Sequence, residues 1–116
     1  MKILFILNDP PYGTERNYNG LRLALNILKK EPRADVVVFL MADAVLCAKK
    51  GQNTPAGYYN IERMLKGVLN RGRVLLCGTC MEARGLTDGD LADGCGRSTL
   101  DELTTLTLDV DKVLVF

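Results

Sequence analysis

The chain has 116 residues, of which 47% are apolar and 25% charged, and we expect one globular domain over residues 1–116. Its 15 basic and 14 acidic side chains leave a formal net charge of +1, so no basic field favours nucleic acid as a partner. No apolar stretch is long enough to span a bilayer. Residues 3–7 are interpreted as a strand rather than a signal peptide, which predicts a cytoplasmic protein without membrane contact.

The first half of the chain predicts two buried strands, each followed by a helix. Continuous apolar runs at residues 3–7 and 36–41 are typical of strands covered on both faces. Thr14 is the expected N-cap of a helix that runs to residue 30 and stops before Pro32. A short helix is expected over residues 43–50, and a polar, turn-rich surface loop follows it.

The second half predicts two more helices and two more strands. Apolar residues at helical spacing predict a helix over residues 61–69 that ends by Gly72. A third strand covers 74–76 and ends at Cys77. The remaining expectations are a short helix over 87–91, a flexible break at 94–96, a capping box at 99–102 that opens a helix, and a last strand at 113–116. Strands that alternate with helices indicate an α/β fold with a mainly parallel sheet and helices on both faces.

Two cysteines follow the third strand in the segment Cys77-Gly78-Thr79-Cys80. The carboxyl ends of parallel strands are where ligands bind, so this placement indicates a reactive sulfur. The pKa of a thiol falls near a helix N-terminus or a cation, and Arg84 is the nearby cation. The chain has no histidine, which excludes Ser-His-Asp and Cys-His nucleophiles. Sulfur transfer through a persulfide needs no histidine.

The Cys-x-x-Cys spacing alone leaves three interpretations open: a disulfide switch, half a metal site, or one nucleophile with an incidental neighbour. Cys77 also fits a buried small apolar residue. Cys47 and Cys95 are isolated and do not supply a second close pair, so no metal site is predicted. Cys47 stands at helical spacing among apolar residues and is expected in the core. The role of Cys95, between two glycines, is left open.

Three other segments carry weaker signals. The loop at residues 10–15 has neither a GxGxxG nor a GxxxxGK[ST] pattern, so no nucleotide or other cofactor is predicted. The pair Tyr58-Tyr59 fits either an interface or half-buried helix positions. Asp88, Asp90 and Asp93 lack the later glutamate of a calcium loop and predict a solvated turn.

Several segments, taken together and in chain order, resemble the DsrE/DsrF-like family and its small single-domain YchN-like branch. The resemblance covers essentially the whole chain. It rests on residues 8–15, Leu21-Arg22-Leu23-Ala24, residues 39–45, residues 57–61, Cys77-Gly78-Thr79-Cys80 with Arg84-Gly85, and residues 111–116.

The resemblance implies a Rossmann-like three-layer α/β/α domain, with a sheet of about five strands, that assembles into homo-oligomers, commonly trimers or hexamers. Sulfur-relay members of the family accept sulfur on a cysteine as a persulfide and pass it to a partner thiol. Their reactive cysteine lies seven residues before the Arg of an Arg-Gly pair, a position held by Cys77 relative to Arg84. Cys80 is absent from some relay relatives.

The expected function is therefore sulfur transfer, as a possible sulfurtransferase with partner proteins that donate and accept sulfur. Cys77 carries the persulfide, Cys80 assists or resolves it, and Arg84 helps to hold the anion, while Gly78 and Thr79 supply loop geometry and backbone donors. The alternatives are a non-catalytic oligomeric binding or scaffold protein, and a Cys-x-x-Cys thiol-disulfide redox protein.

Overall fold

Five parallel strands form one sheet, in the order β4-β3-β2-β1-β5, in the computed structural model, which describes all residues 1–116. The α/β fold and the parallel sheet predicted from the sequence are confirmed. The strands are β1 (Lys2–Leu7), β2 (Asp35–Leu40), β3 (Arg73–Cys77), β4 (Gly96–Ser98) and β5 (Lys112–Val115).

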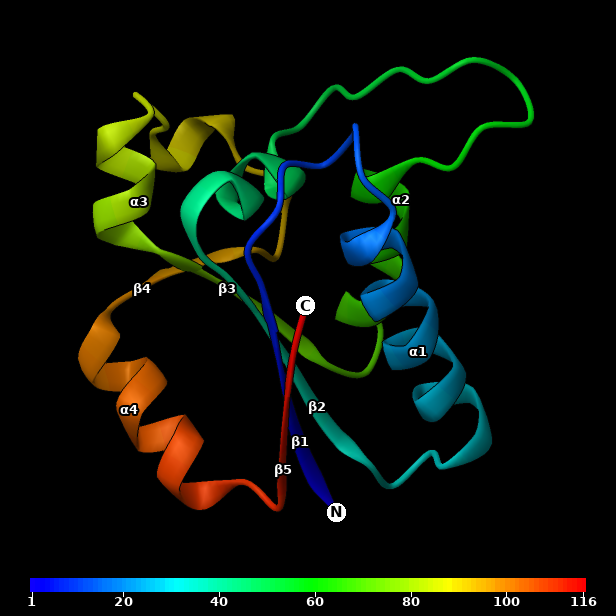
Figure 1. Cartoon of the computed structure of the whole chain (residues 1–116), viewed down its shortest axis with the longest axis vertical. Helices are drawn as coiled ribbons and strands as arrows, with labels where there is room; N and C mark the ends of the chain where they lie inside the picture. The colour runs from blue at the N-terminus through cyan, green and yellow to red at the C-terminus, as the bar shows by residue number, and fades with distance from the viewer.

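Helices cover the two faces of the sheet unequally, with α1 and α2 on one face and α4 on the other (Figure 1). From β1 the chain adds strands in one direction as far as β4, and then crosses back to place β5 beside β1. Because parallel crossovers are right-handed, this reversal moves the last helix to the opposite face. The helices are α1 (Arg16–Lys30), η1 (Ala42–Ala48), α2 (Ile61–Leu69), α3 (Gly78–Ala83), η2 (Asp88–Asp90) and α4 (Leu100–Asp109), where η marks a 3-10 helix.

No helix combines the length and the apolar composition that crossing a membrane requires.

The two faces of the sheet enclose two hydrophobic cores of different size. Side chains alternate along a strand, so Phe5 packs toward α1 and α2 while its neighbour Leu4 packs toward α4. The larger core has 22 buried residues and the smaller has five, among which Leu103 is the single buried residue of α4. The α4 face of the sheet is therefore the less covered one.

Two structural details predicted from the sequence are wrong. Helix α1 begins at Arg16 after an N-cap at Glu15, because the hydroxyl of Thr14 donates instead to the Asp9 carboxylate at 2.8 Å. The predicted break at residues 94–96 runs into β4, where Gly96 pairs with Leu75. A strand of three residues with no apolar run gives no periodic signal in the sequence.

Candidate functional site

Cys77 is the last residue of β3 and the N-cap of α3. Its Sγ accepts a hydrogen bond from the backbone N–H of Cys80 at 3.4 Å. Only 8% of Cys77 is exposed, and it packs in the core beneath α4 with Phe39 and Leu103. The sulfur thus lies at the carboxyl end of the sheet, as predicted, with most of its surface buried.

Gly78 allows the chain to turn from β3 into α3 while it touches the neighbouring strand. A Cβ at this position would lie 3.0 Å from the backbone oxygen of Ser98 and 3.1 Å from Nε of Arg97. Ser98 pairs with Cys77 in the sheet, so this contact fixes the spacing between the cysteine and β4. Thr79 is exposed, and the backbone donor that reaches Cys77 comes from Cys80.

Cys80 lies one helical turn after Cys77 and is partly exposed, and both thiols are free. Burial is the main cause that raises the pKa of Cys80 above its ordinary value, and the neighbouring Cys77 raises it further. The backbone amide of Ala42 and the charge of Arg84 act in the opposite direction on the same pKa. Cys80 is therefore a protonated thiol at neutral pH.

Arg84 connects α3 to the segment after β2. Its Nε donates to Oδ1 of Asp43 at 2.7 Å, and its Nη1 donates to the backbone oxygen of Cys80 at 3.1 Å. The guanidinium therefore contributes positive charge near Cys80 while its hydrogen bonds hold the loop. The seven-residue spacing from Cys77 brings Arg84 to the site, where its side chain donates to the oxygen atoms of Asp43 and Cys80.

Three residues near the cysteines were missed by sequence reasoning: Ala42, Asp43 and Arg97. Ala42 has a φ of 50°, the left-handed region that residues other than glycine rarely adopt, and such strain gathers at functional sites. Arg97 contacts Gly78 and pairs with Glu82 on α3 at 2.5 Å. One available signal was position, because Ala42 and Asp43 follow β2 just as the cysteines follow β3.

The other two cysteines lie apart from this site. Cys47 is fully buried and accepts a hydrogen bond from the side-chain amide of Asn17 at 3.3 Å. Burial raises the pKa of Cys47 to about 12, although the bond from Asn17 lowers it, and its expected place in the core is confirmed. Burial, chiefly, and the carboxylate of Glu62 raise the pKa of the partly exposed Cys95 to about 11.

No group of three or more cysteine, aspartate or glutamate side chains lies close enough together to hold a metal ion. The chemistry that the arrangement offers is therefore that of two neighbouring thiols. One is largely buried and hydrogen-bonded to a backbone N–H, and the other is more exposed with a raised pKa. Neither the Tyr58-Tyr59 pair nor the loop at residues 10–15 belongs to this cluster.

Comparison with known proteins places the chain among small proteins of the same length and fold. It is 42% identical to Protein YchN of Escherichia coli, over 99% of this chain and 98% of that protein. It is 38% identical to Uncharacterized protein MJ0989 of Methanocaldococcus jannaschii, with both chains covered completely. The crystal structure of YchN from E. coli superposes with a TM-score of 0.94 over 99% of this chain and 98% of that one.

A protein of unknown function from Methanobacterium thermoautotrophicum, only 14% identical over 99% of this chain and 98% of its own, shares the fold with a TM-score of 0.78. The model of the DsrE/DsrF-like family matches residues 1–116 in full. With this match and relatives near 40% identity over their whole length, the chain belongs to the DsrE/DsrF-like family.

Proposed function

We propose that this protein is a sulfur carrier that holds sulfur as a persulfide on Cys77. The observation that carries the proposal is the placement of this thiol at the carboxyl end of β3, with a backbone N–H directed at its sulfur. Family membership is consistent with a sulfur-relay role.

Loading of Cys77 requires no general base. It also requires no external oxidant or reductant, because one S–S bond forms as another breaks. The Cys77 thiolate attacks the terminal sulfur of a donor persulfide, R–S–SH, and a new S–S bond forms. The S–S bond of the donor breaks, and the donor leaves as the thiolate R–S⁻. Cys77–S–SH then passes its terminal sulfur to an acceptor thiolate by the same exchange.

Cys80 and Arg84 act on the fate of this persulfide. The raised pKa of Cys80 keeps it protonated at neutral pH, so it does not compete with incoming acceptors. Once Cys80 loses its proton to solvent, its thiolate attacks the inner sulfur of Cys77. That step forms a Cys77–Cys80 disulfide and expels HS⁻. Arg84 donates hydrogen bonds to the Cys80 backbone and to Asp43, which holds both in place. Its guanidinium also adds positive charge near Cys80, which favours the Cys80 thiolate.

Intact mass spectrometry after incubation with glutathione persulfide tests the proposal. The wild-type chain should gain the mass of one sulfur atom, and Cys77→Ser should not. Cys80→Ser should retain the added sulfur longer, because the resolving thiol is gone. Cys95→Ser is the matched control, since it removes a partly exposed thiol outside the site and should load normally. Equal loading of wild type and Cys77→Ser would refute the proposal.

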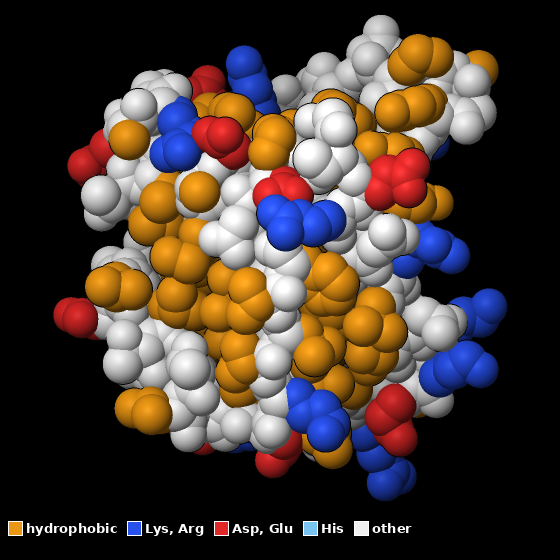
Figure 2. Space-filling view, viewed as in Figure 1, with side chains coloured by type: hydrophobic (Ala, Val, Ile, Leu, Met, Phe, Trp, Pro, Cys, Tyr) orange, Lys and Arg blue, Asp and Glu red, His pale blue; other side chains and the backbone are white.

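We also propose that the carrier works as a homo-oligomer, a trimer or a hexamer. Apolar side chains gather around β5 on the face shown in Figure 2. On the α4 side of the sheet, Val115 is 64% exposed and Leu108 of α4 is 83% exposed. Val113, which shares this side of β5 with Val115, is also exposed. Exposed apolar side chains gathered on one face of a protein are typical of protein–protein contacts.

A further inference from the structure

All four tyrosines of the chain gather in one stacked cluster at the start of α1 and α2. The ring centroids of Tyr18 and Tyr59 are 4.3 Å apart, those of Tyr58 and Tyr59 are 4.7 Å apart, and Tyr12 stacks on Tyr59 at 5.8 Å. Two loops hold the cluster in position: the Tyr12 hydroxyl donates to Gln52 at 2.6 Å and accepts from the N–H of Ile61 at 3.2 Å. Tyr58 and Tyr59 precede α2, so they are not the helix positions considered from the sequence.

Beside this cluster lies a hollow of about 450 Å³ between α1 and α2. Three of the tyrosines, Tyr18, Tyr58 and Tyr59, line it together with Arg22 and Arg63. Arg22 lies over the Tyr18 ring at 5.4 Å, and its Nη1 donates a hydrogen bond to Oδ1 of Asn19 at 3.1 Å. Neither arginine has a carboxylate partner among the ion pairs of the chain.

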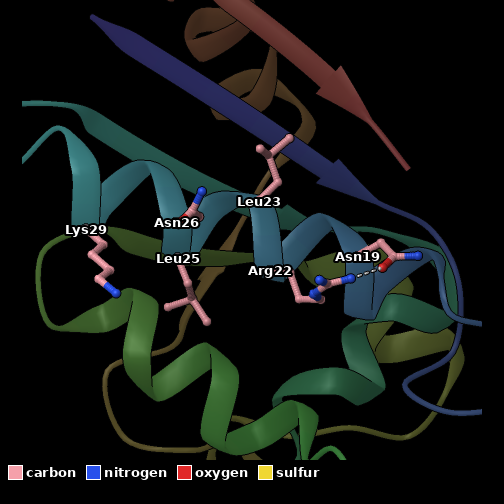
Figure 3. Close-up of a pocket in the computed structure, with 6 residues that line it drawn as sticks. All are labelled: Asn19, Arg22, Leu23, Leu25, Asn26 and Lys29. Carbon is pink, nitrogen blue, oxygen red and sulfur yellow. Dashed lines mark hydrogen bonds between the residues drawn. The ribbon is translucent and has the colours of Figure 1, made fainter.

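The positive charge continues along the outer surface of α1. Arg22 also lines a second hollow of about 650 Å³, together with Lys29, Asn19 and Asn26 (Figure 3). No acidic residue lines either hollow. One acid acts at the edge of the tyrosine cluster: burial is the main cause that raises the pKa of Tyr59, and Glu15 contributes to the rise. The anion-attracting side of the hollow is therefore the Arg22 and Arg63 side.

We propose that this hollow binds a small aromatic phosphate, whose ring stacks on the exposed ring of Tyr58 and whose phosphate pairs with Arg22 and Arg63. Aromatic faces stack on flat rings, and guanidinium groups form paired hydrogen bonds to phosphate oxygens. Two unpaired guanidiniums match the double charge of a phosphate monoester better than the single charge of a carboxylate. The volume suits a ligand of mononucleotide size. The site uses none of the residues of the proposed sulfur carrier.

Isothermal titration calorimetry with two probes, AMP and phenyl phosphate, tests the inference on the wild-type chain. Each should bind with a Kd below about 1 mM. Adenosine has the aromatic ring but no phosphate, and inorganic phosphate has no ring, so each of these should bind at least about tenfold more weakly than AMP. The chain has no tryptophan, so its intrinsic fluorescence comes from the tyrosine cluster alone. Stacking of phenyl phosphate should therefore quench that emission.

The double variant Arg22→Gln/Arg63→Gln should weaken both probes by about tenfold or more, because the charged hydrogen bonds are lost. Tyr58→Leu should weaken them and reduce the quenching. Arg71→Gln is the matched control. Arg71 is exposed, forms no ion pair and lines neither hollow, so its removal changes the charge without touching the site. All four substituted residues are exposed, so the fold should persist, and circular dichroism checks this.

Three results would overturn the inference. The first is that neither probe binds the wild-type chain. The second is that adenosine or phosphate alone binds as tightly as AMP. The third is that the double variant binds both probes as the wild type does, and a lower molar mass of that variant in solution would then make the hollow a contact between copies. Failure of sulfur loading on Cys77 would affect none of these measurements.

Discussion

Close packing at Gly78 limits which residue can follow Cys77. We predict that Gly78→Ala lowers the free energy of unfolding by about 1–3 kcal/mol, because the new Cβ meets the backbone oxygen of Ser98, which cannot move without displacing β4. Urea unfolding measures the loss. Gly89→Ala is the control, since its nearest contact is a side-chain oxygen at 3.8 Å, and its stability should stay within about 0.5 kcal/mol of wild type. Equal stability of the two variants would contradict the prediction.

The residues of the candidate site differ in how far the sequence could identify them. Cys77 and Arg84 are visible because one ends an apolar run and the other stands at a fixed spacing from it. Asp43 is not visible, because its contact with Arg84 joins residues 41 positions apart through the alignment of two strand ends. Ala42 cannot be identified from the sequence either. Its φ lies in the left-handed region, which alanine rarely adopts, so the residue type does not indicate this conformation.

Helix α4 depends on its cap more than α1 and α2 do, because Leu103 is its single buried residue, whereas α1 and α2 each bury several. The hydroxyl of Thr99 accepts from the N–H of Glu102 at 3.1 Å. This is half of the predicted capping box, because the Glu102 carboxylate instead accepts from the hydroxyl of Ser98. The carboxylate thereby links α4 to the end of β4, beside Cys77 in the sheet.

We predict that Thr99→Ala lowers the free energy of unfolding by about 1 kcal/mol, the usual effect of removing an N-cap. Thr104→Ala is the matched control: its exposed hydroxyl bonds only to the Leu100 carbonyl one turn earlier, and alanine is the better helix former, so stability should be unchanged or slightly higher. Thermal unfolding followed by circular dichroism separates the two. A loss in Thr104→Ala as large as in Thr99→Ala would show that the cap is not the cause.

Secondary-structure elements are predicted from the sequence more accurately when they are longer and contain more apolar residues. The runs of β1, β2 and β3 and the spacing of α1 and α2 were recognised, because each buries a regular set of apolar residues. Strand β4 was not recognised, because its residues Gly96-Arg97-Ser98 include no apolar side chain. They form a strand because they pair with β3. Pairing partners distant in the chain are what a local pattern cannot supply.

The whole molecule covers its sheet with two helices on one face and one helix on the other, and this imbalance leaves apolar surface around the edge strand β5 (Figure 2). Val115 of β5 pairs with Ile6 of β1, and both face the α4 side. An edge strand with exposed apolar residues invites a partner unless charges protect it. Asp111 and Lys112, the charged residues adjoining β5 in sequence, lie at its start, and the three residues that follow in the strand are apolar.

We therefore predict that Val115→Glu converts the proposed homo-oligomer to a species of lower molar mass, because burying a carboxylate against an apolar surface is unfavourable. The side chain is exposed in the single chain, so the variant should fold, with a far-UV circular dichroism spectrum like that of wild type. Light scattering coupled to size-exclusion chromatography measures the mass. Ala56→Glu, which adds the same charge at an exposed apolar residue in the loop before α2, should keep the wild-type mass. A monomeric wild type, or equal masses for Val115→Glu and wild type, would contradict an assembly built on this face.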